Sequence, residues 1–386
     1  MLYLESPRGV GFSYRDATAP EDNEFNDDKT ASDAVLALKS FFRAYPEYNN
    51  REFYVTGESY GGVYVPTLVD ALIKELQKQQ NDLPMNLVGF AIGNGEMDEI
   101  DQINSAVDLN YFRGIIGKDD YDELYDCCKD SLNGDQLVYC DFTQWYTLDQ
   151  YGNAAANQYD DQKQQKCADS IVSFGFDLVW NTTNNVYNTY QDCYTNDVSA
   201  AKATKKVRAS SRTLNLFSNY EDPFLDQGSL NNVESTDAMN AFQCYMGDAT
   251  EKYLNLQAVR QALHIPDTLP YWVDCNDDIN EIYYHQQHND TGPVFDSIIN
   301  SGHPIRFLLF NGDVDMACNF MGDQWFIERM AKRNDIPATI AYRSWDYTRA
   351  QGMLPVGAGF AKRFAKDDVT IDMLTVKGAG HYVPTD

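Results

Sequence analysis

The chain has 386 residues, of which 43% are hydrophobic and 13% aromatic, and its formal net charge at pH 7 is −28. This composition supplies a large hydrophobic core and excludes a disordered or fibrous chain. The strong negative charge disfavours binding to the phosphates of a nucleic acid, and no apolar run is long enough to cross a membrane.

The first part of the chain alternates predicted strands and helices. The opening residues, MLYLESP, predict a strand that runs into a turn, and they lack the basic region and the apolar core of a signal peptide. Residues 30–44 carry apolar side chains at helical spacing behind Ser and Asp cap candidates, which predicts a helix. EFYVTG then predicts a short buried strand, residues 63–79 a second helix, and NLVGFAIGNG a strand that ends in a glycine turn.

The middle of the chain has a different composition. Between about residue 94 and residue 244 the apolar periodicity weakens, and Asn, Gln, Asp and Tyr become frequent. Six of the eight cysteines fall there, which predicts disulfides that staple a loop-rich segment in an oxidising compartment. Because no C-x2-C pair or Cys/His ladder is present, we expect no zinc site. We interpret residues 94–244 as a cap inserted between two parts of one core, residues 1–93 and 245–386.

Several other signals are weaker. Sequons at Asn181 and Asn289 agree with passage through the secretory pathway. The basic stretch Lys202 to Arg212 predicts a solvated loop, with an exposed processing loop as the alternative. His285 and His288 have one-turn helical spacing but lack the glutamate and third ligand of a metalloprotease. We interpret them as surface histidines and expect neither a metal nor a cofactor.

Polar residues follow three predicted strands and predict a catalytic site. VTGESYGG has the Gly-x-Ser-x-Gly pattern that projects a nucleophile, Ser59, from a strand–turn–helix junction; a plain glycine turn is the alternative. The base and the acid that such a serine needs are found after IRFLLF, at Asp313 or Asp315, and after MLTV, at His381. Strand-end reasoning leaves both aspartates open. Tyr60, which follows the nucleophile, is expected to donate its backbone N–H to an oxyanion.

Five stretches resemble the serine carboxypeptidases: LYLESPRGVGFSY, GESYGG, GNG, NGDVDMACNFMGDQWF and GAGHYVPTD. They occur in matching order along the whole chain. The resemblance implies an α/β-hydrolase core, with a central mixed and mostly parallel sheet flanked by helices, that carries a cap. It implies hydrolysis of the C-terminal peptide bond of peptides at acid pH through an acyl-enzyme. It also selects Asp315 as the acid of a triad with Ser59 and His381.

The resemblance assigns further roles. A protonated Glu58 would donate a hydrogen bond to the C-terminal carboxylate of the substrate; a cap on the following helix is the alternative role. A free thiol at Cys318 is expected near the active site. The implied disulfides are Cys127–Cys167, Cys128–Cys140 and Cys193–Cys244.

This sequence also departs from the family pattern. The family has a Gly-Gly-Pro-Gly-Cys stretch that supplies a second oxyanion donor, a second acid for the carboxylate site and a partner for Cys275, and no such stretch is found here. The chain also stops at HYVPTD, without the final helix of the family, and Tyr382 stands at a position that varies among members. We therefore expect a fragment of an active enzyme, poorly stable and weakly active as written.

Two other functions compete with peptide hydrolysis. An esterase or acyltransferase would use the same triad without a preference for a free substrate carboxylate. A non-catalytic protein would bind and protect lysosomal glycosidases, a role that should survive Ser59→Ala. The resemblance further implies a lysosomal or secreted location and, besides peptide substrates, a homodimer.

Overall fold

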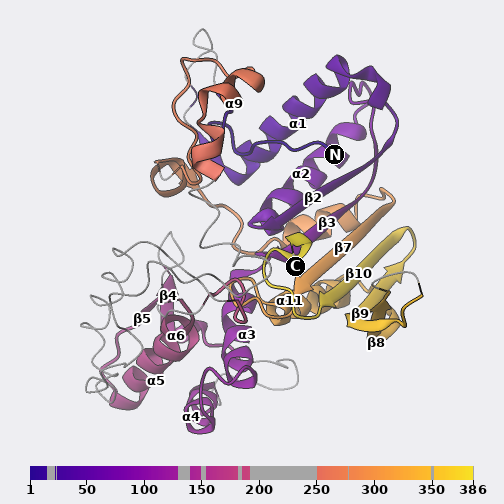
Figure 1. Ribbon diagram of the computed structural model, residues 1–386. Coiled ribbons are helices and arrows are strands. Elements are labelled where there is room, and N and C mark those ends of the chain that lie inside the picture. The colour runs from indigo at the N-terminus through magenta and orange to yellow at the C-terminus, as the bar shows by residue number, and fades with distance from the viewer. Residues whose placement is uncertain are drawn as a thin grey trace.

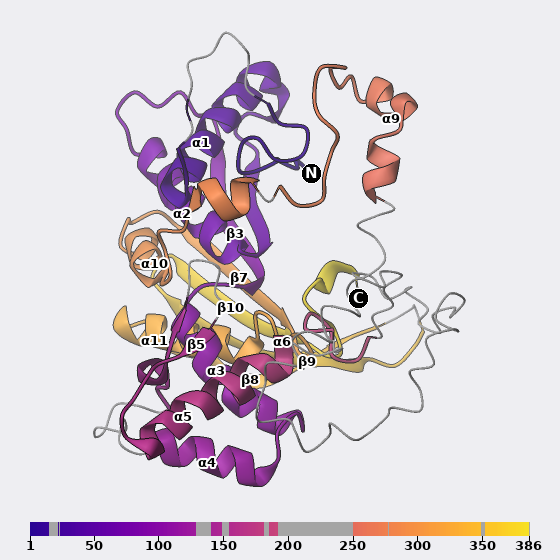
Figure 2. The same cartoon turned by 90° about the vertical axis from the view of Figure 1, so that its left-hand side faces the viewer.

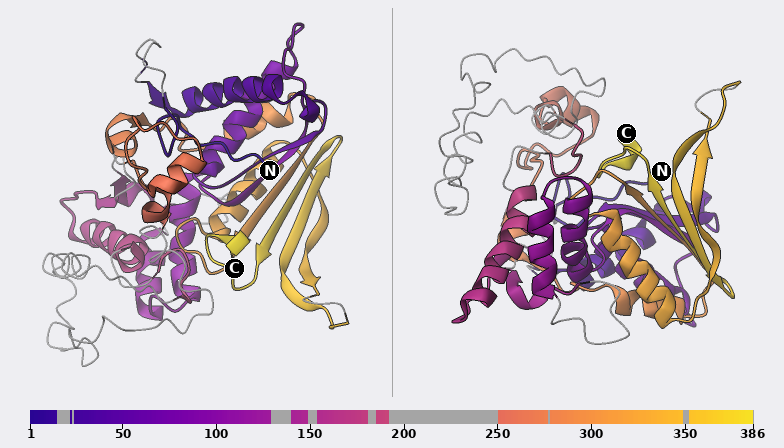
Figure 3. Two further views of the ribbon diagram at one scale, coloured as in Figure 1. Left: turned by 45° about the horizontal axis from the view of Figure 1, so that its top comes forward. Right: turned by 90° about the horizontal axis from the view of Figure 1, so that it is seen from below.

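A six-stranded sheet forms the centre of the computed structural model, in the order β2-β3-β7-β10-β9-β8 (Figure 1). The first four strands are parallel to one another, whereas β9 and β8 are antiparallel additions at one edge (Figure 3). This is the mixed, mostly parallel sheet that was expected. The strands are β2 Glu52–Ser59, β3 Asn86–Gly95, β7 Ile305–Gly312, β8 Ala338–Tyr347, β9 Val356–Lys366 and β10 Val369–Val376. The structure describes residues 1–14, 22, 24–128, 140–148, 154–180, 185–191, 250–276, 278–348 and 352–385.

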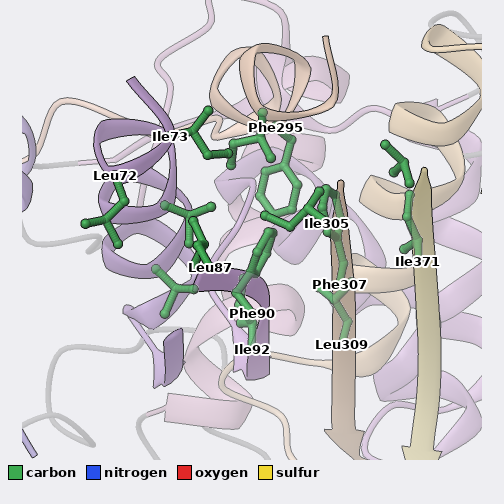
Figure 4. Packing of buried hydrophobic residues seen from close by; sticks show 14 of the residues in the cluster. Leu72, Ile73, Leu87, Phe90, Ile92, Phe295, Ile305, Phe307, Leu309 and Ile371 are labelled. Carbon is green, nitrogen blue, oxygen red and sulfur yellow. The ribbon is translucent and has the colours of Figure 1, made fainter. Parts of the chain in front are cut away.

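Four helices pack on one face of this sheet and share a single hydrophobic cluster with it (Figure 4). Along β7, the side chains of Ile305, Phe307 and Leu309 are buried in that cluster, whereas those of Arg306 and Leu308 are exposed. Because alternate side chains of a strand point to opposite faces, the main core lies on the helix-covered face. The helices are α1 Asp27–Ala44, α2 Gly61–Leu76, α10 Gly292–Ile299 and α11 Phe320–Arg333.

A second hydrophobic cluster lies between β3 and β7 in the sequence, and its helices gather away from α1 and α2 (Figure 2). Two disulfides cross it, Cys127–Cys167 between α4 and α5, and Cys128–Cys140. Both are pairs that the resemblance implies, whereas the third pair, Cys193–Cys244, lies outside the described residues, as do Asn181 and residues 202–212. The elements are α3 Glu99–Phe112, α4 Lys118–Cys128, α5 Gln162–Val172, β4 Tyr146–Leu148 and β5 Ala154–Ala156.

The remaining described elements are short. β1 and β6 pair in parallel and bring the start of α1 beside the segment that precedes α10. In the part of the chain that the structure describes, no helix is both long and apolar enough to cross a membrane. The short elements are β1 Phe25–Asn26, β6 Tyr284–His285, α6 Leu178–Trp180, α9 Gln257–Ala262, three 3-10 turns (Pro46–Tyr48, Thr143–Trp145, Val383–Thr385) and two π turns (Ser173–Asp177, Asp278–Tyr283).

The predicted strand at MLYLESP is wrong, because the first 14 residues contain no strand. The Glu5 carboxylate accepts the backbone N–H of Phe12 at 2.9 Å, so the segment folds back on itself. A strand would need a neighbouring strand to satisfy its backbone groups.

The predicted helix at residues 30–44 begins earlier, at Asp27. Asn26, and not a later Ser or Asp, caps it by accepting the backbone N–H of Lys29. The next helix begins at Gly61 and ends at Leu76, slightly before the predicted range on both sides.

Candidate active site

Ser59 is the last residue of β2 and has a φ of +62°. This left-handed conformation is strained for a residue other than glycine, and it is the geometry of a turn that projects a nucleophile. The backbone N–H of Glu96, just after β3, donates to the Ser59 carbonyl at 2.9 Å and fixes the turn to the neighbouring strand. A Cβ on Gly62 would lie 2.6 Å from the Glu96 backbone, so this close approach requires glycine.

His381 and Asp315 meet beyond the carboxyl ends of β10 and β7. His381 Nδ1 lies 2.7 Å from Asp315 Oδ2, and both side chains are almost fully buried. A Cβ on Gly312 would lie 1.9 Å from the Gly380 carbonyl oxygen, so glycine permits the two loops to touch. Asp313 turns elsewhere and accepts the backbone N–H of Gly378 at 2.7 Å. Of the two candidate acids, Asp315 is therefore the one that contacts the histidine.

The Asp315 carboxylate is held by donors on several sides. Oδ2 accepts the side-chain amide of Asn94 at 2.8 Å and the backbone N–H of Cys318 at 3.2 Å, and Oδ1 accepts the backbone N–H of Ala317 at 2.9 Å. Burial raises the pKa of Asp315, while the histidine and the backbone donors oppose that rise. The arrangement favours a fixed, charged carboxylate beside His381.

Asn94 has a role that sequence reasoning missed. It lies in β3 with a φ of +39°, donates to Asp315, and accepts the backbone N–H of Gly312 at 2.9 Å. It therefore ties the end of β3 to the loop that carries the acid. The sequence signal for this residue is the GNG stretch, which places an asparagine between two glycines at the end of a predicted strand.

Cys318 links the serine to the acid. The Ser59 side chain lies close enough to the Cys318 thiol to lower its pKa, while the backbone N–H of Cys318 donates to Asp315. Burial raises the pKa of Cys318 well above its ordinary value, with nearby carboxylates adding to the rise, so the thiol remains neutral. The structure thus places a reduced thiol beside Ser59, where the resemblance implies one.

Two carboxyl groups flank the Ser59 turn. Burial raises the pKa of Glu58 to about 6, with His381 lowering it and Asp315 adding to the rise. Burial also raises the pKa of Glu96 to about 7, with Glu99 and Asp27 adding to the rise. Both groups therefore take up protons in mildly acidic solution. Sequence reasoning selected Glu58 and missed Glu96.

The alternative role of Glu58 as a helix cap finds no support. Tyr60 is the residue that precedes α2, and it makes no side-chain capping bond. Among the hydrogen bonds of the described residues, none joins the Glu58 side chain to the first turn of α2.

Aromatic rings surround the histidine. The Tyr187 ring centroid lies 5.0 Å from that of His381, and the Tyr382 ring packs edge-on at 5.1 Å. The backbone N–H of His381 donates to the Tyr187 carbonyl at 2.7 Å. These contacts and the contact with Asp315 together hold the imidazole in place.

The other candidate groups lie apart from this site. His285 is exposed, and His288 Nε2 lies 3.0 Å from Asp28 Oδ1. Within the described ranges no group of three or more His, Cys, Asp or Glu side chains is arranged to hold a metal ion. Asn289 is exposed, as a glycosylation site would require.

Comparison with known proteins identifies the family. The family model described as serine carboxypeptidase matches residues 1–386. Serine carboxypeptidase ctsa-3.1 of Caenorhabditis elegans is 33% identical over 418 residues, covering 100% of this chain and 70% of the relative. Lysosomal protective protein of Mus musculus is 32% identical over 397 residues, covering 100% of this chain and 72% of the relative.

A solved structure shows the same fold. It is that of Kex1Δp, a prohormone-processing carboxypeptidase from Saccharomyces cerevisiae, with a TM-score of 0.59 and 18% identity, covering 99% of this chain and 70% of that chain. The shared fold is that of the α/β-hydrolases. With a family model matching from the first residue to the last, the chain belongs to the serine carboxypeptidase family.

Proposed function

We propose that this chain hydrolyses the C-terminal peptide bond of peptides, with Ser59 as the nucleophile, His381 as the base and Asp315 as the acid that orients it. The observation that carries the proposal is the buried 2.7 Å contact between His381 Nδ1 and Asp315 Oδ2, beside the strained Ser59 turn. Membership of the serine carboxypeptidase family supports the reaction class.

The contacts of each side chain suggest its step in the reaction. With Nδ1 donating to Asp315, the Nε2 atom of His381 is left to accept the Ser59 proton as the hydroxyl attacks the substrate carbonyl. The same proton then passes to the leaving amine, which departs as the C-terminal amino acid. Water repeats the sequence on the acyl-enzyme and releases the shortened peptide. The backbone N–H of Tyr60 stabilises the oxyanion in both steps.

Recognition of the substrate carboxylate is assigned to Glu58. Below a pH of about 6 its carboxyl group is protonated and donates a hydrogen bond to the terminal carboxylate, whereas above that pH two negative charges would repel. This behaviour predicts peptidase activity at acid pH.

The location and partners follow from the relatives. The name of the mouse relative, lysosomal protective protein, places that protein in the lysosome. We propose a lysosomal or secreted location for this chain, with peptides that have a free C-terminus as substrates. The homodimer, the binding of glycosidases, the division into core and cap, and glycosylation at Asn181 and Asn289 stay predictions.

The test compares three substrates of one sequence: a peptide with a free C-terminus, its C-terminal amide and its C-terminal ester. At pH 5 we expect the C-terminal residue to be released from the free acid in preference to the amide, and Ser59→Ala to abolish release. Cleavage of the ester with no preference for the free acid would indicate the esterase. Release of the C-terminal residue that persists in Ser59→Ala would contradict the proposal.

A further inference from the structure

Asp27, the first residue of α1, is a fully buried carboxylate that touches the nucleophile turn. Its Oδ1 atom accepts the hydroxyl of Tyr60 at 2.9 Å, and Tyr60 directly follows Ser59. The same Oδ1 atom accepts the hydroxyl of Tyr284 at 2.8 Å. A group more than 30 residues away in the sequence thus holds the side chain next to the nucleophile.

The other oxygen of Asp27 is bound to the backbone. Oδ2 accepts the N–H of Gln287 at 2.6 Å and the N–H of His288 at 3.1 Å. Among the ion pairs of the described residues none involves Asp27, so hydrogen-bond donors and not a cation compensate its burial. Because four donors surround it, the carboxylate is a fixed point to which a mobile group can be anchored.

Within the described part of the chain, Asp27 is the one hydrogen-bond partner of the Tyr60 hydroxyl. It packs edge-on against Tyr64, with ring centroids 4.9 Å apart, and edge-on against Tyr284 at 6.3 Å. Burial raises the pKa of Tyr60 and of Tyr284, so both hydroxyls keep their protons and remain donors. The far end of the Tyr60 side chain is therefore fixed, and rotation of its backbone would break the bond to Asp27.

We infer that Asp27 is a positioning residue for catalysis, which acts through the Tyr60 hydroxyl to hold the Tyr60 backbone N–H toward the oxyanion. This inference rests on the proposed function, in which that N–H is the donor. A purely structural role for Asp27, joining α1 to residues 284–288, would involve the Tyr284 hydroxyl equally. The two tyrosines therefore separate the two roles.

The experiment compares Tyr60→Phe with Tyr284→Phe in the full chain. Each variant removes one hydroxyl donor from the same oxygen of Asp27 and keeps its aromatic ring. Because the Tyr284 hydroxyl also contacts the Thr30 hydroxyl at 3.3 Å, Tyr284→Phe should lower the unfolding midpoint at least as much as Tyr60→Phe. A misplaced oxyanion donor lowers the rate of the chemical step and leaves ground-state binding intact, so Tyr60→Phe should lower kcat about tenfold with KM unchanged. Tyr284→Phe should leave kcat unchanged.

Two further readouts make the result decisive. The kcat losses in Tyr60→Phe and Asp27→Asn should be non-additive in the double variant, since both break one contact. Hydrogen exchange of the backbone amides in residues 57–64 should be faster in Tyr60→Phe than in Tyr284→Phe. Asp27→Asn places an amide among four donors and can prevent folding. The comparison of Tyr60→Phe with Tyr284→Phe does not require the Asp27→Asn variant.

Equal kcat values and equal exchange in the two tyrosine variants would overturn the inference. Failure of the proposed function would look different: the unaltered chain would release no C-terminal residue and would not react at Ser59 with a fluorophosphonate. In that case the exchange measurement alone decides, because faster exchange in Tyr60→Phe supports the anchoring and equal exchange rejects it.

Discussion

Carboxyl groups around Ser59 differ in the hydrogen-bond donors that surround them. Asp315 accepts hydrogen bonds from Asn94, His381 and two backbone amides, which stabilise its charge. Glu58 and Glu96 are half-buried, and burial raises their pKa values to about 6 and about 7. The site therefore combines a carboxyl group that four hydrogen-bond donors hold against His381 with two carboxyl groups that take up protons in mildly acidic solution.

The two aspartates after β7 provide a matched pair of variants. Asp315→Asn removes the acceptor that fixes the histidine tautomer and should lower kcat by about 10⁴, the loss seen for this change in serine proteases. Asp313→Asn changes a carboxylate whose one hydrogen bond within the described residues is with the Gly378 backbone N–H, and kcat should stay unchanged. Peptide hydrolysis measured at pH 5 checks both. A large loss in Asp313→Asn, with Asp315→Asn active, would exchange the two roles.

Glu58→Gln should move the upper pH limit of peptidase activity. An amide remains a donor at every pH, so KM for a free-acid peptide should no longer rise as the pH increases past about 6. The C-terminal amide of the same peptide serves as control, because its pH dependence should be the same in both proteins. Identical pH profiles for the free-acid peptide would remove Glu58 from substrate recognition.

At the scale of elements, the carboxyl ends of β2, β3, β7 and β10 and the loops that follow them carry Ser59, Asn94, Glu96, Asp315 and His381. These four strands are parallel, so their ends meet at one edge of the sheet, and ligands of α/β proteins bind at that edge. Close contacts between loops at that edge depend on glycine, as at Gly62 against the Glu96 backbone.

Gly62→Ala should damage the nucleophile turn. The added Cβ would lie 2.6 Å from backbone atoms of Glu96, so β3 and α2 must separate and the Ser59 turn must shift. We expect loss of most activity. We also expect the free energy of unfolding to fall by a few kcal/mol, about the cost of overpacking. Gly61→Ala is the control, since its Cβ would meet only Val65 at 3.9 Å. Activity assays and urea unfolding compare the two. Equal activity and equal stability of the two variants would show that the close contact between Gly62 and the Glu96 backbone is not needed.

Much of this arrangement could be predicted from the sequence, because strand ends and glycine turns are local signals. The strands at EFYVTG, NLVGFAIGNG, IRFLLF and MLTV are present in the structure, with Ser59 at the end of the first and His381 after the last. Asn94, Glu96 and Asp27 were missed because their roles depend on contacts between segments far apart in the chain. The choice of Asp315 over Asp313 needed the family resemblance for the same reason.

The strand at MLYLESP failed for a complementary reason. Local alternation of apolar residues predicts a strand, but a strand forms only where a neighbour accepts its hydrogen bonds. Here the Glu5 carboxylate accepts the backbone N–H of Phe12 within the same segment.

The predicted boundary after residue 93 also differs from the structure. β3 continues to Gly95, so that boundary divides a strand of the sheet.

The whole molecule carries a large excess of negative charge. Its formal charge of −28 implies strong self-repulsion at pH 7, which falls as carboxylates take up protons. Glu58 and Glu96 add to this effect, because their folded pKa values lie above the ordinary value of 4.5. The folded chain therefore binds more protons than the unfolded chain between about pH 4.5 and pH 7, and stability falls as the pH rises through that window.

This predicts a higher unfolding free energy at pH 5 than at pH 7.5. The shift of Glu96 corresponds to about 3 kcal/mol, as an order of magnitude, so Glu96→Gln should flatten much of the decline. Glu47→Gln, at an exposed glutamate, should leave the slope as it is. Urea unfolding across this pH range checks the prediction. Stability that rises from pH 5 to pH 7.5 would contradict it.

The central claim is that Ser59 is activated by His381, which is held by Asp315. The most direct measurement is the rate of modification by a fluorophosphonate, with the adduct located by mass spectrometry. The account predicts one modified residue, Ser59, and a much slower reaction in His381→Ala. An adduct on another serine, or an equal rate at Ser59 in His381→Ala, would contradict it.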